Sequence, residues 1–339
     1  MASIRDIAKM AGVSAASVSR ILNEDPTFSI NEQTRIRVIE IANRLNYSVS
    51  QNKKGARTKG NELSLALIVR HQEKSEEDDP YFRKIRLGIE KEAAKWRLRA
   101  VVAFRMRDQE KDWSQLAQFG AVIMIGEMTQ RAVDRIAQVN RNLIFVDNYS
   151  KTDQYDCIQT DFERKTAEVL QVLYDKGHRR IAFIGGYSSI VDEDGSVVHK
   201  QEEIRANSYE NWMKLKGLEE YTTIYQGSWK PEAGLELGSQ LLAQENLPTA
   251  VLVASDPMAV GVYKAINEAG LKIPEDIAVA SFDDIEMAQF LTPSLSSIKA
   301  DPEEMGRLAV RIAKERMLQE RKMPIRIICA SQLILRDSI

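Results

Sequence analysis

Residues 4–23 read IRDIAKMAGVSAASVSRILN, and this stretch decides how the chain begins to fold. Its apolar residues follow a helical spacing on both sides of Gly12-Val13-Ser14, which predicts two short helices separated by a tight turn. Two short helices joined by a glycine-containing turn are typical of the helix-turn-helix, which places its second helix in the major groove of DNA. The sequence therefore predicts a DNA-reading module at this end of the chain.

Each predicted helix has a polar residue placed to cap its N-terminus. Ser3 is expected to cap the first helix and Ser14 the second. A third helix is expected over residues 32–45, with Ser29 as part of its start signal. We expect this helix to pack through Ile36, Ile39, Ala42 and Leu45.

The second predicted helix has an outward face of small residues. Its inward stripe is formed by Val18, Ile21 and Leu22, which leaves the other positions to face outward or to flank the edge. Small uncharged side chains let the helix backbone approach a DNA groove closely, and the guanidinium of Arg20 can bond both acceptors of a guanine edge. The residues of this region that we expect to contact DNA are Ser14, Ala15, Ala16, Ser17, Ser19, Arg20 and Asn23.

The distribution of charge favours DNA binding over the plainer alternative, a three-helix bundle that binds nothing. Residues 1–60 carry ten Lys and Arg against five Asp and Glu, a net charge of +5, whereas the whole chain has a net charge of −2. The remaining residues therefore carry −7. A basic module on an acidic body is typical of a protein of which only one part meets phosphate.

Length and composition bound the rest of the chain. At 339 residues it is too long for one ordinary core and suits a small module followed by two domains. No apolar run reaches the length that a bilayer requires, and charged residues stand where a signal peptide would be apolar, so we expect a cytoplasmic protein without a membrane partner. Cys157 and Cys329 lie in strand-like stretches and are expected to be buried thiols. The histidines show no metal-ligand spacing, so we expect no metal and no cofactor.

Beyond residue 61, short apolar runs alternate with amphipathic helical stretches. The first series has expected strands at 65–69, 100–104, 121–125 and 143–146, with helices at 82–96, 113–119 and 131–139. After a break over 149–161, strands at 181–184, 222–225, 250–254 and 277–282 alternate with helices at 164–175, 204–215, 232–243 and 258–269. This alternation predicts an α/β core of two doubly wound parallel-sheet subdomains behind an all-α helix-turn-helix head.

Polar residues follow four expected strands at the point where each strand ends. They are Asp147, Gly185-Gly186, Ser255-Asp256 and Asp283-Asp284. Ligands of doubly wound sheets bind beyond the carboxyl ends of the strands, so these residues could line one polar cleft. An aspartate after a strand can equally be a helix cap or a turn residue, and position alone leaves both interpretations open.

The N-terminal residues Ile4-Arg5-Asp6-Ile7-Ala8, then Ala11-Gly12-Val13-Ser14 and Val18-Ser19-Arg20, resemble the opening of the lac and gal repressor (LacI/GalR) family. The resemblance extends from Ala2 to the end. It implies a transcriptional repressor whose core is similar to periplasmic binding proteins and holds a sugar effector between its subdomains. The effector contacts that it implies are Asp147, Arg205, Trp229, Ser255 and Asp283. In such a site carboxylate and guanidinium groups hold adjacent sugar hydroxyls, while an indole face covers the apolar side of the ring.

The chain departs from the family pattern at two positions near this site. Ser255 stands where an asparagine is common, and Ser208 stands where a glycine precedes the aromatic residue. Residues 23–26, the DPYF stretch at 79–82 and Gly185-Gly186 look most like repressors of β-galactosidase operons. That resemblance implies galactose or a galactoside as the effector, with another hexose or a pentose derivative as the second choice. The residues leave open whether the sugar releases DNA or promotes DNA binding.

The resemblance also implies the domain limits: a head over 1–46, a hinge over 47–61, a first subdomain over 62–160 with 296–322, and a second over 161–295 with 323–339. The strand expected at 295–299 and the helix at 302–318 then return to the first subdomain, and the last strands, around 325–335, complete the second. The chain ends at residue 339 without the heptad tail of the tetrameric lac repressor. We therefore expect a homodimer that reads a pseudo-palindromic operator in double-stranded DNA.

The hinge departs from its relatives, which usually carry a proline after the third helix and a leucine that wedges into the minor groove. Val49 and Ala56 occupy those places. Ala56 lacks the bulk that unstacks a base step. We therefore expect this hinge to bend DNA less than its relatives do, and to contact phosphates through Lys53, Lys54 and Arg57.

Two other classes of protein share parts of this pattern. A stand-alone sugar-binding protein of the transport type shares the two-domain body and is the alternative, but it has no use for a basic helical head. An enzyme is not expected, because no GxGxxG or GxxxxGK[ST] pattern follows any expected strand and no combination of nucleophile, base and orienting residue is recognisable.

Overall fold

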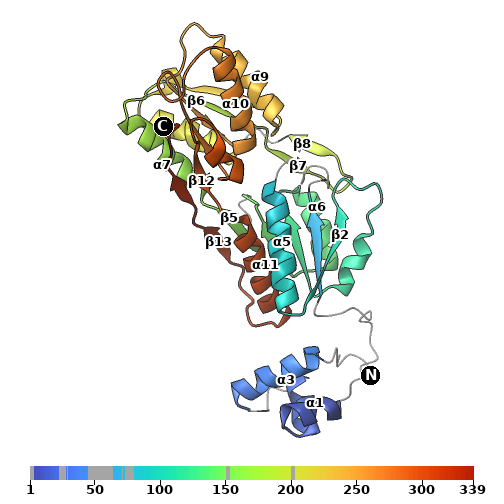
Figure 1. Ribbon diagram of the computed structural model, residues 1–339. Coiled ribbons are helices and arrows are strands. Elements are labelled where there is room, and N and C mark those ends of the chain that lie inside the picture. The colour runs from blue at the N-terminus through green and yellow to red at the C-terminus, as the bar shows by residue number, and fades with distance from the viewer. Residues whose placement is uncertain are drawn as a thin grey trace.

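The computed structural model describes residues 4–22, 28, 30–44, 64–70, 72, 80–149, 153–199 and 203–339. Figure 1 shows a helical head and two α/β units, which we call the first unit and the second unit. The expected fold class is confirmed. The hinge residues Val49, Lys53, Lys54, Ala56 and Arg57 lie outside the described part of the chain, as do Ser3, Asn23 and Ser29.

The head has a small core of its own. Its helices are α1 (Ile4–Ala11), α2 (Ala15–Leu22) and α3 (Glu32–Arg44). Each helix contributes a fully buried residue to this core: Ile7 from α1, Val18 from α2 and Val38 from α3. The expected packing of α3 through Ile36 is wrong: the Ile36 side chain is 49% exposed, and Val38 takes the inward place.

The helix caps explain where the helices of the head begin. Ser14 is the residue before α2, and its Oγ accepts a hydrogen bond from the Ser17 N–H at 3.0 Å, as the sequence predicts. The residue before α3 is Asn31, whose Oδ1 accepts from the Gln33 N–H at 2.8 Å. Asn31 therefore caps α3, a role that the sequence had led us to associate with Ser29.

The first unit is a six-stranded parallel sheet in the order β13-β5-β4-β3-β1-β2. Its strands are β1 (Ser64–Val69), β2 (Arg99–Arg105), β3 (Ala121–Ile125), β4 (Leu143–Val146), β5 (Asp156–Thr160) and β13 (Arg326–Cys329). Its helices are α5 (Pro80–Lys95), α6 (Gln130–Val139) and α11 (Pro302–Met317), with the short helix η2 (Trp113–Gln118). Every residue of β1 is buried, as expected for a central strand that is covered by helices on both faces.

Alternate residues of β1 belong to the cores on opposite faces of the first sheet. Leu65 and Leu67 lie in the apolar cluster that contains Ile85 of α5. Ile68 lies in the cluster that contains Ile136 of α6. This is the period of two that a β-strand imposes on its side chains.

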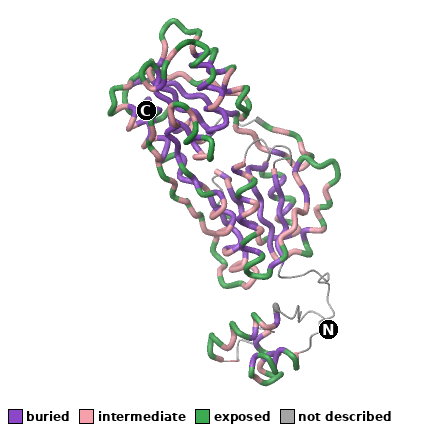
Figure 2. Tube along the Cα trace, in the orientation of Figure 1, coloured by how far each residue is buried: buried purple, intermediate pink, exposed green. Residues whose placement is uncertain are grey.

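The second unit repeats this plan around a sheet in the order β14-β12-β11-β10-β6-β9, in which only the β12–β14 pair is antiparallel. Its strands are β6 (Ile181–Gly186), β9 (Thr223–Gly227), β10 (Ala250–Val253), β11 (Ala278–Phe282), β12 (Ser296–Lys299) and β14 (Gln332–Ile334). Its helices are α7 (Phe162–Asp175), α8 (Ile204–Leu215), α9 (Pro231–Leu242) and α10 (Asp256–Glu268), with η3 (Glu219–Tyr221) and η4 (Glu286–Phe290). Figure 2 shows buried residues along the strands of both units and exposed residues on the outer helices and loops.

Glycines allow a close helix pair in each unit. A Cβ built on Gly306 of α11 would lie 2.1 Å from the carbonyl oxygen of Ile85 in α5, and one on Gly261 of α10 would lie 2.0 Å from the carbonyl oxygen of Pro231 in α9. Such distances are shorter than any real contact. The two pairs, α5 with α11 and α9 with α10, therefore approach one another backbone to backbone.

The sheets overturn two of the expected strand assignments. The strand β12 was expected in the first unit, but it pairs with β11 of the second. The strand β13 was expected in the second unit, but it pairs with β5 of the first. The helix α11 does pack in the first unit, against α5. The reason is the direction of the strands: a parallel strand ends at the carboxyl edge that faces the other unit, so the chain crosses after a strand has been completed and not before it.

The crossing segments are held together at Asp161. Its N–H donates to the carbonyl oxygen of Cys329 at 3.1 Å, and its Oδ1 accepts from the Ser331 N–H at 2.9 Å and from the Ser331 hydroxyl at 2.5 Å. The crossing after β5 and the crossing after β13 therefore lie side by side. Cys157 is buried in β5 and Cys329 is half-buried in β13, and both are free thiols.

A hairpin that the sequence did not lead us to expect follows β6. It consists of β7 (Ser189–Val191) and β8 (Val197–His199), which form a two-stranded antiparallel sheet. The sequence signal for it is weak but present, because two short β-branched runs flank Asp194-Gly195, a dipeptide that favours tight hairpin turns. The strand β5 was missed as well, since it lies in the stretch that had been interpreted as a break.

None of the helices in the described part of the chain is long and apolar enough to span a bilayer. Across the same residues, no three His, Cys, Asp or Glu side chains gather in a way that could hold a metal ion.

Candidate functional site

The outward face of α2 has the small, accessible side chains that the sequence predicts. Ala15, Ala16 and Arg20 are exposed, and Ser17 and Ser19 are half-buried. The hydroxyls of Ser14 and Ser17 lie 2.8 Å apart. Apart from Arg20, the side chains of α2 on this face are small, so the helix backbone can come close to a DNA groove.

The Arg20 guanidinium has a defined position on that face. Its Cζ lies 5.5 Å from the centre of the Phe28 ring, a distance typical of a cation–π contact. This contact restrains a long side chain and lowers the conformational entropy that it would lose on meeting a base pair.

The second candidate site lies where the carboxyl edges of the two sheets approach each other. Asp147 follows β4 in the first unit and Asp283 follows β11 in the second, and both have a left-handed backbone, with φ of 57° and 104°. This conformation costs free energy for residues other than glycine, and it is concentrated at functional sites. Backbone bonds hold both aspartates there: the Asp147 N–H donates to Ile158 O at 2.9 Å and the Asp283 N–H donates to Ile298 O at 2.8 Å.

Arg205, the second residue of α8, lies at the centre of this site. Its Cζ is 4.7 Å from the ring centre of Phe162, 4.9 Å from that of Trp229 and 5.4 Å from that of Phe282. Its Nη1 donates to Ala254 O at 2.7 Å, which ties α8 to the end of β10.

Arg205 keeps its charge although most of its side chain is removed from solvent. Burial alone would lower its pKa, but the carboxylates of Glu203 and Asp283 outweigh burial and raise the pKa above its usual value. Glu203 also caps α8 and receives the Arg205 Nε–H at 2.8 Å. A fixed cation beside carboxylates and flat rings is well suited to a polyhydroxylated ring, because charged groups bind hydroxyl pairs and aromatic faces cover C–H surfaces.

Trp229 approaches the site from the segment between β9 and α9. Its Nε1 donates to the Tyr187 carbonyl oxygen at 3.1 Å. Its indole lies against Gly186, the last residue of β6. Of the strand-ending residues that the sequence identified, Gly186 therefore has a steric role: it leaves room for the ring.

Ser255 lies next to this cluster, between β10 and α10. Its side chain is 4% exposed, and its hydroxyl has no hydrogen-bond partner within the described part of the chain. It precedes α10 without capping it through its side chain. A buried hydroxyl without a partner costs free energy, and a ligand hydroxyl would provide the missing bond.

The neighbouring aspartates after β10 and β11 have structural roles. Asp256 Oδ1 accepts from the Ser297 hydroxyl at 2.7 Å and Oδ2 from the Ile285 N–H at 2.8 Å, while Asp284 accepts from Arg336 at 2.6 Å. Burial raises the pKa of Asp256 to about 6. These two residues brace the loop that carries Asp283.

Two tyrosines complete the polar floor of the site in the first unit. The hydroxyls of Tyr81, from α5, and Tyr149 lie 3.2 Å and 3.3 Å from Oδ1 of Asp147, to which they donate. Burial, and then the nearby Asp147 carboxylate, raise the pKa of both phenols well above its usual value. The phenols therefore remain neutral donors at physiological pH.

Burial raises the pKa of Asp147 to about 6, and the positive charge of Arg205 only partly opposes the increase. Neither Tyr81 nor Tyr149 is among the residues that were expected to contact the effector. The DPYF stretch was the only sequence signal for Tyr81. That Tyr81 lies beside Asp147 follows only from the position of α5 next to the end of β4.

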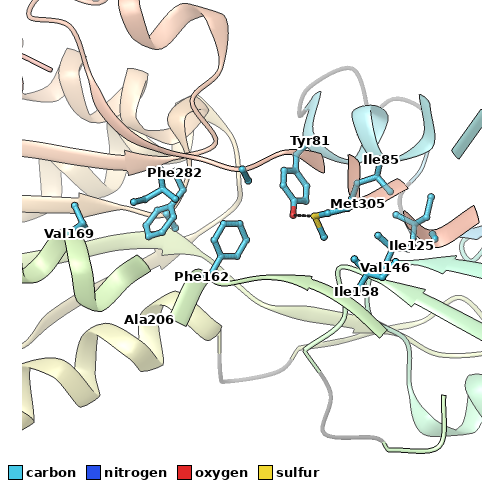
Figure 3. Packing of buried hydrophobic residues seen from close by; sticks show 14 of the residues in the cluster. Tyr81, Ile85, Ile125, Val146, Ile158, Phe162, Val169, Ala206, Phe282 and Met305 are labelled. Carbon is cyan, nitrogen blue, oxygen red and sulfur yellow. Dashed lines mark hydrogen bonds between the residues drawn. The ribbon is translucent and has the colours of Figure 1, made fainter. Parts of the chain in front are cut away.

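Aromatic contacts connect the two units across this site. Phe162, the first residue of α7, lies 6.4 Å from Tyr81 and 6.2 Å from Tyr149 of the first unit, and 5.6 Å from Phe282 of the second, measured between ring centres. Figure 3 shows Phe162 and Phe282 on one side, and Tyr81 on the other, with its hydroxyl directed at the sulfur of Met305. One continuous apolar cluster therefore runs from one unit to the other.

The comparison with known families gives two matches. The family model described as "Bacterial regulatory proteins, lacI family" matches residues 3–50. The model described as "Periplasmic binding protein-like domain" matches residues 170–339. The first match covers the head, and the second covers most of the second unit and the end of the first.

Full-length relatives support the same architecture. The chain is 33% identical over 339 residues to the HTH-type transcriptional regulator GalR of Streptococcus thermophilus, covering 100% of this chain and 99% of the relative. It is 34% identical over 343 residues to the HTH-type transcriptional repressor MelR of Bacillus subtilis (strain 168), covering 100% of this chain and 97% of the relative.

Solved structures share the fold at lower identity. One is the transcriptional regulator CelR in complex with cellobiose, with a TM-score of 0.69 and 22% identity over 100% of both chains. Another is the lac repressor dimer bound to operator and the anti-inducer ONPF, with a TM-score of 0.68 and 22% identity over 99% of this chain and 98% of that one.

Proposed function

The chain belongs to the LacI family of bacterial regulatory proteins, and from this premise we propose that it represses a sugar-utilisation operon under the control of a sugar bound between its two units. As a member of that family it is a DNA-binding transcriptional regulator and not an enzyme. The sugar, the operon and the site residues are our proposal, together with action in the cytoplasm, where the operator is.

The observation that carries the proposal is the surrounding of Arg205. A buried guanidinium lies between the rings of Phe162 and Trp229, and the Asp283 carboxylate helps to maintain its charge. Carbohydrates present pairs of hydroxyls beside a patch of C–H groups, and this arrangement offers partners for both. We assign effector contacts to Asp147, Arg205, Trp229, Ser255 and Asp283.

We propose galactose or a galactoside as the first candidate effector, and another hexose or a pentose derivative as the second. Two carboxylates, Asp147 and Asp283, face the site from opposite units, so a ring with hydroxyls along both edges can bond each unit. The unpartnered hydroxyl of Ser255 offers a further bond.

We assign DNA contacts to Ser14, Ala15, Ala16, Ser17, Ser19, Arg20 and Asn23, and phosphate contacts to Lys53, Lys54 and Arg57 of the hinge. A homodimer would present two α2 helices to the halves of a pseudo-palindrome. A sugar that bonds both units changes their closure and thereby the spacing of the two heads. Coupling between two such sites is typically about 1–3 kcal/mol, which is enough to shift an operator between bound and free states.

The test of this proposal is a thermal-shift panel of galactose, lactose, cellobiose and ribose on the purified protein. A sugar at about 100 times its Kd stabilises the folded state by about 2.7 kcal/mol, which raises the melting temperature. A sugar that does so should also change the affinity for duplexes selected from a random library. Asp283→Ala should remove the response to sugar and leave sugar-free DNA binding unchanged.

The proposal is wrong if no sugar in a wider panel changes the melting temperature or the DNA affinity. It is also wrong if the dimer binds all duplex sequences equally at physiological ionic strength, because the head would then read no bases.

A further inference from the structure

The hairpin β7–β8 leaves the second unit between β6 and α8 and docks on the first unit. The carbonyl oxygen of Val191 accepts a hydrogen bond from the Thr129 N–H at 3.1 Å, and Val191 forms a parallel bridge with Met128. The Val191 side chain is 1% exposed and belongs to the apolar cluster of the first unit that contains Phe104 and Met124. A residue from the second unit thus fills part of the core of the first.

Ion pairs fix the turn of the hairpin to the N-terminus of α6. Glu193 lies 3.2 Å from Arg135 and also pairs with Arg131, and Arg131 lies 3.8 Å from Asp192. The Thr129 hydroxyl donates to Asp192 while its oxygen caps α6 by accepting from the Ala132 N–H. Two carboxylates at a helix N-terminus are also favoured by the helix dipole.

The base of the hairpin touches the candidate sugar site from both sides. The Tyr187 carbonyl oxygen receives the Nε1–H of Trp229, which belongs to the second unit. The Ser189 hydroxyl accepts a hydrogen bond from the guanidinium of Arg70, which follows β1 of the first unit. The segment from Tyr187 to Ser189 therefore connects Trp229 of the second unit with the carboxyl edge of the first sheet.

The position of the hairpin determines what it can do. The units are joined covalently by crossings that follow β5, β12 and β13. Figure 1 shows β7 and β8 on the opposite side of the two units from β5 and β13. If the units hinge at the crossings, the side that opens to admit a sugar is the side that the hairpin spans.

We propose that the hairpin β7–β8 is a tether that holds the two units closed over the effector, so that its contacts with α6 contribute to effector affinity. The inference rests on the proposed function. A sugar that bonds both units binds only when they are closed, and its apparent Kd rises as the closed fraction falls. Weakening the tether should therefore weaken sugar binding without altering any group that touches the sugar.

Glu193→Arg tests the tether, because it places a third positive charge beside Arg131 and Arg135. We expect the Kd of the best-binding sugar of the panel, measured by titration calorimetry, to rise about fivefold. Adding Arg135→Glu to this variant restores an ion pair of reversed polarity and should recover part of the affinity. Glu245→Arg makes the same change of charge on an exposed loop of the second unit, and it should bind sugar like the parent.

Hydrogen exchange of the sugar-free proteins provides a readout that needs no ligand. Exchange over residues 128–139 and 187–199 should be faster in Glu193→Arg than in Glu245→Arg, because the Thr129 amide is bonded to the hairpin. The tether is refuted if the two variants exchange alike, or if Glu193→Arg binds sugar as tightly as the parent. If no sugar binds even the parent, the proposed function fails, and the exchange rates alone decide whether the hairpin ties the units together.

Discussion

The indole of Trp229 occupies the space that a side chain on Gly186 would need: a Cβ on residue 186 would lie 2.1 Å from Cε2 of Trp229. Gly186 ends β6, and Trp229 stacks beside the guanidinium of Arg205 at 4.9 Å. The position of one ring of the proposed sugar site therefore depends on the absence of a side chain at residue 186.

Gly186→Ala should displace Trp229 and weaken sugar binding. We expect the Kd for the sugar to rise about tenfold, which corresponds to ~1.4 kcal/mol, while sugar-free operator binding is unchanged. Titration calorimetry and a gel-shift assay measure the two affinities. Gly217→Ala is the control. Its φ of +68° makes the substitution strain the backbone, but no atom lies within 4 Å of the added Cβ, so no neighbouring side chain is displaced. Equal effects of both substitutions would assign the loss to general destabilisation.

Asp147 should make the stability of the sugar-free protein depend on pH between about 4 and 6. Burial raises its folded-state pKa from 3.8 to about 6, so between these values the folded protein binds more protons than the unfolded chain. The stability contributed by the protonated carboxyl is present below pH ~4 and is lost as the pH rises through about 6.

Asn at this position is uncharged at every pH and mimics the protonated carboxyl. The melting temperature of Asp147→Asn, relative to the parent, should therefore rise between pH 4.5 and pH 7. Asp175→Asn, on an exposed carboxylate at the end of α7, serves as the control and should show no such trend. A relative melting temperature that stays constant across this range would show that Asp147 titrates normally.

Arg20→Ala should change the sequence preference of the head and not only its affinity. We expect a loss of about 1–3 kcal/mol on the preferred operator and a relaxed preference at one base pair. Arg37→Ala removes another exposed arginine, from α3, and should leave the preference unchanged. Binding measured on single-base-pair variants of the operator decides the matter, since an equal loss on every duplex would remove Arg20 from base reading.

Gly306→Ala should destabilise the first unit. The added Cβ would lie 2.1 Å from the carbonyl oxygen of Ile85, so α5 and α11 would have to separate. We expect a loss of about 1–3 kcal/mol in the free energy of unfolding, measured by urea denaturation. Helix propensity alone would make alanine more favourable than glycine inside α11 by roughly 1 kcal/mol. A Gly306→Ala variant that is as stable as the parent, or more stable, would therefore contradict the close contact between α5 and α11.

Local patterns explain why much of the fold could be predicted. The helices of the head, the central strands and the strand-ending aspartates follow from the spacing of apolar residues and from residues such as Ser14 that cap a helix. The predictions failed for the short hairpin strands β7 and β8, for β5, whose sequence DCIQT has no apolar run, and for the sheets that β12 and β13 join. A short edge strand carries too few residues to show a period, and its partner can lie far away along the chain, as Cys157 and Arg326 do.

The candidate site was predictable in part for the same reason. The sequence located Asp147, Ser255 and Asp283 at strand ends, and the resemblance added Arg205 and Trp229. Tyr81 and Tyr149 were missed, because a tyrosine near a strand end has no distinctive pattern until the fold places its hydroxyl beside a carboxylate.

The sequence by itself determined that the chain has a basic helical head and an alternating α/β body, because helix caps and periods of two and 3.6 residues act over a few positions. The tertiary structure alone decided which sheet β12 and β13 join, where the hairpin docks, and that the Asp147 carboxyl is shifted towards its neutral form. These features depend on contacts and burial between segments that are distant in the sequence, and no local pattern encodes such distances.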